Sequence, residues 1–373
     1  MIFLLTTLTI PAGKTVIAIT YQDKDITQNI APYLLSFSFT DNSGGKADDL
    51  SITLQDRAGL WLANWQPSKS DIISASIIKH DFPDTLSLPC GSFSVDQIEY
   101  SYPPAVLGIK AVSSSIKKSI SQEKHTRYFE NMTLSEIASD LAADNGLSLF
   151  MSSYGSGVLE RVDQTEQSDL EFLKALCADY GQECKIQEGQ LIIYDLEEYE
   201  NKSPVTSLAL DDKRLLAVKF TSKSAKVYRK ARVRYHDALK DEDYEAEYED
   251  EYEEGSERVL ELHERAESQS HAEEIARNRL NDANRKEITG SLTLMGDVRL
   301  AAGVTIELED FGMFSGKHFV NKVTHKIDRS GYTSTLELGM PKSEKSSAKS
   351  GKSKAQSKST GSTEIYYEGD KHY

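Results

Sequence analysis

Leu34-Leu-Ser-Phe-Ser-Phe-Thr40 alternates large apolar side chains with small hydroxyl-bearing ones, and it decides how the first third of the chain is interpreted. Period-two alternation places the apolar residues on one face of an extended strand. Similar runs lie on both sides of it, separated by clusters of Gly, Pro, Asn and Asp. Short strands at regular spacing with such turns predict a barrel or a sandwich. The other runs span residues 15–21, 51–55, 71–78, 91–100 and 106–112.

The pattern changes to helical spacing in the middle of the chain. Thr133-Leu-Ser-Glu136 and Ser168-Asp-Leu-Glu171 both match the capping box, in which a hydroxyl and a carboxylate satisfy the first amides of a helix. Leucines and other apolar residues follow each box at intervals of three and four. Glu188-Gly189 lies between two apolar runs and predicts a hairpin. This region therefore predicts a small α+β unit.

Strand-like segments return after Leu215, and a third capping box at Ser270-His-Ala-Glu273 predicts a helix near 271–284. The resulting fold class is α+β, mainly β. We expect a first β domain over 1–115, a small α+β domain over 116–200, a second β domain over 201–340 with an acidic insertion at 241–254, and an extended Ser/Lys-rich tail over 341–373. The tail is expected to be anchored by Ile365, Tyr366 and Tyr367, which could add a strand to a neighbouring sheet edge.

Composition excludes several classes of protein. Lys and Arg number 43 against 59 Asp and Glu, so the formal net charge is −16 and tight binding of DNA or RNA is not expected. No apolar run approaches the ~20 residues needed to span a bilayer, so no membrane insertion is expected. Met1 to Ile10 is apolar, but it lacks the basic residue and the cleavage site of a signal peptide, so we expect a strand there. The three cysteines are too few for a disulfide framework and indicate a reducing compartment.

Catalytic motifs are absent from the sequence. It contains no GxSxG elbow, phosphate loop, HExxH or CxxC motif. Cys177 and Cys184 are predicted to be two buried thiols, because Gly181 should end the helix between them. The sequence therefore predicts no enzyme activity, no cofactor and no metal.

The segment Asp241 to Glu254 carries ten acids in fourteen residues. Such a run predicts a solvated loop whose charges repel one another. A segment that contacts a partner is the first alternative, with Asp241, Tyr244, Tyr248, Tyr252 and Glu253 as its candidate residues. A calcium loop is the second, although an EF-hand needs Gly at the sixth position, where Ala246 stands. Ten acids from each of several copies would repel one another inside a channel, so we expect the run on an outer rim.

Several short motifs occur in a characteristic order. They are Lys46-Ala-Asp-Asp-Leu-Ser-Ile-Thr-Leu54, Trp65 with Pro67, Cys90-Gly-Ser-Phe-Ser-Val-Asp96, Arg161-Val-Asp-Gln-Thr-Glu-Gln-Ser-Asp-Leu-Glu-Phe-Leu173, Gly303 to Leu308, Gly316 to Val320, His325, and Thr333 to Leu338. Together they resemble the phage late control protein D family, the tail hub proteins of contractile phage tails and phage-tail-like particles. The acidic run departs from the family pattern, and we expect no appended cell-wall-binding or lytic domain after the tail.

The resemblance implies two tube-protein-like β-barrels in one chain with the α+β domain between them. It implies a homotrimer, whose six similar barrels would dock a sixfold tail tube above while a threefold spike docks below. Surrounding baseplate subunits would be further partners, and a tape-measure protein or DNA would pass through the channel without tight binding. The expected location is the baseplate of a virion tail, assembled in the host bacterial cytoplasm.

Two other classes of function are compatible with the composition. A tail-tip peptidoglycan-degrading enzyme would need two carboxylates at a defined separation, and no such pair is framed by the sequence. A cell-wall-binding or sugar-binding module would favour clustered exposed aromatic side chains. Trp61 and Trp65 are the only tryptophans, and both are expected in the core or in a turn.

Overall fold

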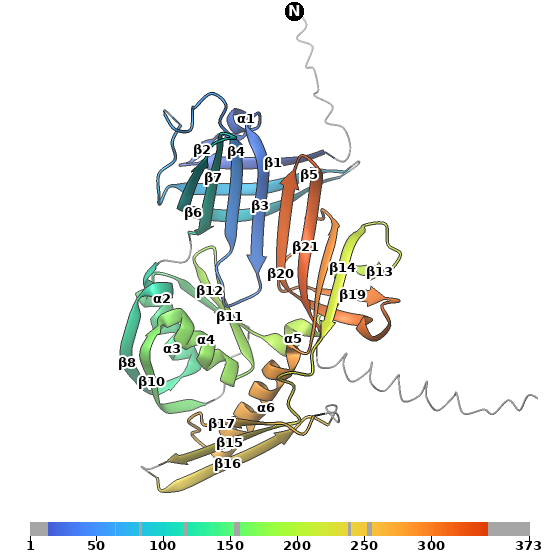
Figure 1. The fold of residues 1–373 in the computed structure, drawn as a ribbon. Coiled ribbons are helices and arrows are strands. Elements are labelled where there is room, and N and C mark those ends of the chain that lie inside the picture. Colours follow the sequence, from blue (N-terminus) through green and yellow to red (C-terminus); the bar gives the residue numbers. More distant parts are fainter. Residues whose placement is uncertain are drawn as a thin grey trace, which may run out of the picture.

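The computed structural model describes residues 14–63, 65–81, 84–114, 118–152, 157–237, 240–251 and 256–341 (Figure 1). The strand expected at Met1–Ile10 and the tail from residue 342 onward lie outside the described residues. In the part of the chain that is described, no helix is long and apolar enough to cross a membrane.

Strands from the two ends of the chain share one sheet. Among the described residues it has 13 strands, and its main path runs β14-β18-β21-β20-β3-β4-β7-β6-β5-β1-β2, with β19 on β20 and β13 on β19 (Figure 1). The early strands are β1 (Lys14–Tyr21), β2 (Lys24–Asp25), β3 (Leu34–Asn42), β4 (Asp49–Gln55), β5 (Ile72–His80), β6 (Thr85–Ser101) and β7 (Val106–Ser113), and the short helix α1 (Thr27–Ile30) follows β2. The late strands are β13 (Ser207–Ala209), β14 (Leu215–Ser222), β18 (Ile288–Met295), β19 (Thr305–Glu309), β20 (Gly316–Asp328) and β21 (Gly331–Gly339), with a 3-10 turn at Gly312–Phe314.

The two strand-rich halves meet where β20 pairs antiparallel with β3. Each half nevertheless has its own apolar core, one around Phe37, Phe39 and Phe93 and the other around Val320 and Leu336. The alternation in 34–40 is confirmed, because Phe37 and Phe39 are buried in the first core. The mainly β, α+β class is confirmed as well.

His325 is a buried polar residue at this seam. It lies opposite Phe39 on β3, and the two rings stack. Burial lowers the pKa of its imidazole to about 4, so the ring is neutral at pH 7. Its Nε2 therefore donates to the carbonyl of Leu300 at 3.0 Å, while the single lone pair of Nδ1 is shared between the hydroxyls of Tyr332 at 2.8 Å and Ser334 at 3.1 Å. Both ring nitrogens thus have hydrogen-bond partners inside the protein.

The middle of the chain folds as a separate α+β unit with its own core. Its elements are α2 (Lys118–Gln122), β8 (Lys124–Thr133), α3 (Leu134–Asp144), β9 (Ser148–Met151), β10 (Val158–Ser168), α4 (Asp169–Asp179), β11 (Gln182–Gln187), β12 (Gln190–Asp195) and α5 (Leu196–Glu200). Both predicted capping boxes are confirmed, at Thr133 for α3 and at Ser168 for α4. The predicted hairpin is confirmed as β11 and β12. Gly181, at φ +67°, follows the end of α4, and Cys177 and Cys184 are free, buried thiols as predicted.

A third layer lies below these two parts in Figure 1. It consists of a three-stranded sheet, β16-β15-β17, with helix α6 (Gln269–Arg285) packed on it. The strands are β15 (Lys230–Asp237), β16 (Glu242–Glu249) and β17 (Val259–Leu262). The predicted helix is present, but its cap was wrong. Ser268 is extended and its hydroxyl accepts from the amide of His271 at 3.2 Å, so the helix begins before Ser270.

Candidate assembly surface

Eight residues of the acidic run form a strand rather than the solvated loop that the sequence predicted. Residues Glu242–Glu249 form β16, which pairs along its whole length with β15. The loop prediction was wrong because it counted the acids without their cross-strand partners. β15 carries a basic side chain at every second position, directly opposite the acids, so their repulsion is cancelled.

The strand has two chemically distinct faces. Tyr244, Ala246 and Tyr248 alternate with the acids and turn toward α6, where Ala246 is buried and both tyrosines are partly buried. Tyr248 lies opposite Ala231 and Ala246 opposite Val233, so the apolar face of β16 completes a core that β15 and α6 share. Two of the three candidate tyrosines, Tyr244 and Tyr248, therefore pack partly against this core.

The other face of this sheet is a ladder of ion pairs. Lys230 and Arg232 both contact Glu247, at 2.7 and 2.8 Å, and Arg232 also reaches Glu261 on β17 at 3.2 Å. The ladder continues with Arg234 to Glu245 at 2.9 Å and Arg229 to Glu249 at 2.7 Å. Hydrogen bonds from Lys230 and Arg232 lower the pKa of Glu247, and those from Arg229 and Lys230 lower the pKa of Glu249. The pairs face solvent, so each is individually weak and sensitive to salt.

The remaining predicted site residues fall on either side of this strand or beyond the described chain. Asp241 precedes β16 and is exposed, in a left-handed conformation with φ +52°. Tyr252, Glu253, Ile365, Tyr366 and Tyr367 lie outside the described residues. For the calcium alternative, the described part of the chain holds no group of three or more His, Cys, Asp or Glu side chains arranged to hold a metal ion. Among the described residues β16 is an edge strand of its sheet, and most of its exposed side chains are carboxylates.

A buried charge cluster, which the sequence analysis did not predict, joins the large sheet to the α+β unit. Lys185 on β11 places its ammonium 2.6 Å from Asp41 and 3.6 Å from Asp48, and all three residues are buried. Asp41 also accepts from the amide of Ala302, and Asp48 from the amide of Asn42. Burial raises the pKa of Asp48 to about 6, and Asp41 adds to the shift, while Lys185 opposes it. Asp41 lies on β3, Asp48 belongs to the Lys46–Leu54 motif, and Lys185 lies on β11.

Two glycines let the turn between β3 and β4 approach the α+β unit closely. A Cβ on Gly44 would lie 2.4 Å from Cγ of Glu183, and Gly45 has φ +67°. The turn is held by the amide of Gly45, which donates to the carbonyl of Cys184 at 3.2 Å, and by the hydroxyl of Tyr194, which donates to the carbonyl of Ser43 at 2.9 Å. These contacts join the β3–β4 turn to β11 and β12.

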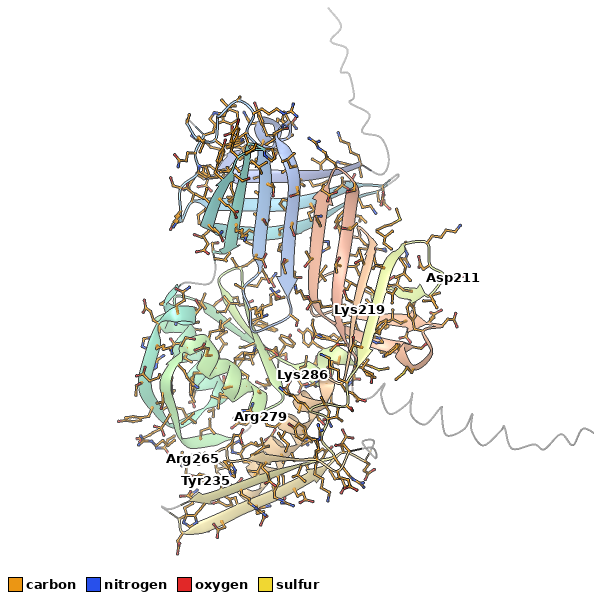
Figure 2. The ribbon with its side chains drawn as sticks, viewed as in Figure 1. Asp211, Lys219, Tyr235, Arg265, Arg279 and Lys286 are labelled. Carbon is orange, nitrogen blue, oxygen red and sulfur yellow. The ribbon has the colours of Figure 1, made fainter. Side chains whose placement is uncertain are left out.

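Helix α6, which packs on the sheet that contains β16, also contacts the α+β unit. Arg279 contacts the carboxylate of Asp179 at 2.8 Å, and Asn278 donates to the carbonyl of the same residue at 2.8 Å. Arg285 donates two hydrogen bonds, of 2.8 and 3.0 Å, to the carboxylate of the buried Glu200. Figure 2 labels Arg279 on α6 and Lys286 just after its end. A cavity of about 840 Å³ lies among them, lined by both acidic and basic side chains.

Comparison with known proteins relates this chain to a protein family. Residues 118–331 match the family model described as phage tail baseplate hub (GPD). A curated relative, the probable baseplate hub protein of Escherichia phage P2, is 29% identical over 194 residues, which is 51% of this chain and 48% of that protein. The corresponding protein of Escherichia phage 186 is 28% identical over 205 residues and is covered to the same extent, 48%. The match thus spans about half the length of these relatives.

Solved structures share the fold at low sequence identity. A 43 kDa tail protein of prophage MuSo2 from Shewanella oneidensis has a TM-score of 0.68 at 14% identity, covering 87% of this chain and 98% of that one. A tail protein of Neisseria meningitidis also has a TM-score of 0.68, at 12% identity, covering 87% of this chain and 96% of that one. A type VI secretion component of E. coli has a TM-score of 0.51 at 13% identity, covering 89% of this chain and 78% of that one.

Proposed function

Because the chain belongs to the phage tail baseplate hub family, we propose that it is a homotrimeric hub that joins a sixfold tail tube to a threefold central spike. The observation that carries this proposal is the continuous sheet in which β20 meets β3. It gives one chain two strand-rich halves with separate cores. Three such chains present six similar positions on one side and three on the other, which is what a sixfold-to-threefold junction needs.

The proposed role is structural. The matched family and the curated relatives are named as baseplate hub proteins, and this supports a scaffold in a phage-type tail rather than an enzyme. We place the protein in the tail baseplate, with assembly in the host cytoplasm, and assign the tube protein, the spike and the surrounding baseplate subunits as its partners. The negative net charge of −16 supports a channel that a tape-measure protein or DNA crosses without being held.

The oligomeric mass tests the proposal directly. Light scattering of the purified full chain at micromolar concentration is expected to give about three times 41.6 kDa. The interface should be extensive, because stable assemblies commonly bury more than ~2,000 Å² in total. A persistent monomer or a stable dimer would refute the trimeric hub.

We also propose that the carboxylate-lined edge of β16 faces outward and meets a basic baseplate subunit. The variant Glu245→Gln, Glu247→Gln, Glu249→Gln is expected to trimerise normally but to bind the outer subunit roughly tenfold more weakly at low salt. The difference should shrink as salt is added, because screening removes the attraction in both proteins. Attachment is measured by co-sedimentation with assembled particles.

A matched control removes the same charge elsewhere. Glu123→Gln, Glu130→Gln and Asp140→Asn change three exposed acids of the α+β unit and should leave attachment unchanged. Equal weakening in both variants would mean that only net charge matters, and no weakening in the first would show that the ladder serves the fold alone.

A further inference from the structure

Strand β14 forms a free edge of the large sheet. Among the described residues it pairs only with β18, and most of its side chains are exposed. Leu216 is 56% exposed and Val218 39%, although Val218 lies opposite Leu292, which is fully buried in the core of this half. Exposed apolar side chains are therefore combined with backbone groups that have no strand beside them.

This edge lacks the protection that the other long edge has. Edge strands usually carry charges, prolines or bulges that prevent pairing with another chain. The free edge of β16 has five acids in eight residues, whereas Leu215-Leu-Ala-Val-Lys-Phe-Thr-Ser222 has one charge, Lys219. Leu210, just before β14, and Met295, bound through its amide to the carbonyl of Arg214, are each 56% exposed as well. Figure 2 marks the region with Asp211 and Lys219. Such an edge is expected to be covered.

The chain leaves the described structure beside this edge. Gly339, the last residue of β21, pairs with Thr289 of β18, and Thr289 pairs with Thr221 of β14. Met340 then donates to the carbonyl of Ile288. Pro341 thus stands about two strand spacings, roughly 10 Å, from the end of β14. A segment that crossed this distance and turned along β14 would run antiparallel to it.

The sequence beyond Pro341 contains one segment suited to such an edge. Residues 342–364 are rich in Ser and Lys, and Ile365-Tyr-Tyr367 follows them. A flexible linker of this length has a mean reach of roughly 25 Å, enough to cross the gap and follow most of β14. We propose that Ile365, Tyr366 and Tyr367 add to the free edge of β14 in the same chain, as an additional antiparallel strand. This inference does not depend on the hub role.

The side chains fit this arrangement as well as the backbone does. Strand addition obtains its affinity from main-chain hydrogen bonds and its specificity from alternate side chains. Aromatic residues opposite aliphatic or β-branched ones are favourable cross-strand pairs, which suits Tyr366 opposite Val218. Tethering raises the local concentration of the segment to the millimolar range, so the chain's own segment outcompetes a second copy in dilute solution.

Hydrogen exchange of the β14 amides tests the proposal. In the full chain, amides on the free side of β14 are expected to be protected, and the variant Ile365→Asp, Tyr366→Asp, Tyr367→Asp should exchange at least about tenfold faster there. The control Ser346→Asp, Ser347→Asp, Ser350→Asp adds the same charge to the linker and should keep the protection. Equal exchange in the full chain and the first variant would overturn the proposal.

A disulfide distinguishes the same chain from a second copy. The three native cysteines are buried, so Val218→Cys with Tyr366→Cys supplies an accessible pair. Oxidation at low concentration is expected to give a cross-link within one chain, seen as a faster band of monomer mass under denaturing conditions. Cross-links only between differently tagged chains, or β14 protection that rises with protein concentration, would assign the edge to a second copy and refute the proposal. A chain that fails to trimerise but forms the internal cross-link would refute only the hub assembly.

Discussion

Replacing Lys185 with Met is expected to lower the free energy of unfolding by about 3–5 kcal/mol, because it leaves two buried carboxylates without their cation. Asp41 and Asp48 are 8% and 6% exposed, so water cannot take the place of the ammonium. Their amide donors, Ala302 and Asn42, remain, but neither compensates a full charge. Urea denaturation followed by circular dichroism measures the loss, and limited proteolysis should show cleavage between the large sheet and the α+β unit first.

Two further variants serve as a control and as a rescue for this prediction. Lys24→Met removes an exposed lysine of β2 and is expected to change stability by less than about 0.5 kcal/mol. Asp41→Asn, Asp48→Asn with Lys185→Met removes all three charges, and it should recover much of the loss, since a neutral buried cluster needs no counter-ion. If Lys185→Met alone were as stable as the native chain, the cluster would have to be hydrated in solution.

The elements that sequence reasoning located correctly are those whose cause is local. Each capping box needs only residues three positions apart, and both boxes of the α+β unit hold their helices as predicted. Alternation in 34–40 needs only neighbours along the strand. The third box failed for an equally local reason, because Ser268 and Ser270 both offer a hydroxyl and the extended backbone of Ser268 decides between them.

The acidic run shows where a single segment misleads. Tyrosines at 244, 248 and 252 recur every four residues, but with Ala246 between the first two they also fit a period of two. The decisive signal was available at 230–236, where Lys, Arg, Arg and His occupy alternate positions. Two alternating segments of opposite charge predict a paired sheet, whereas either one alone predicts repulsion.

The junction could not be predicted in the same way. Lys185 and Asp41 are 144 residues apart, and nothing near either residue indicates the other. A lysine between Cys184 and Ile186 is compatible with an exposed strand position, yet β11 is covered on both faces by the sheet turn and by α4. Burial of this kind follows from how the parts are placed against each other, which a linear pattern does not encode. The free edge of β14 is invisible for the same reason.

Leu173→Ala is expected to cost roughly 2–5 kcal/mol, because its side chain fills the centre of the α+β core. Leu173 is 1% exposed and belongs to the same core as Ile137 and Leu141 of α3 and Ile193 of β12. Truncation leaves a cavity that the short, capped helices can close only in part. Leu62→Ala is the matched control, since Leu62 is 56% exposed and should lose little.

The two thiols of the α+β core allow the loss of stability to be measured in that core alone. Cys177 lies one helical turn after Leu173, and Cys184 lies on β11 in the same core. If Leu173 supports the core, the variant should expose both thiols to a labelling reagent at denaturant concentrations where Cys90, in the other core, stays protected. A loss below about 1 kcal/mol with unchanged labelling would mean that this face of α4 contributes little to folding and is available to a partner. The position of Leu173 inside the Arg161–Leu173 motif would then reflect assembly, whereas the buried geometry predicts that this end of the motif serves the fold.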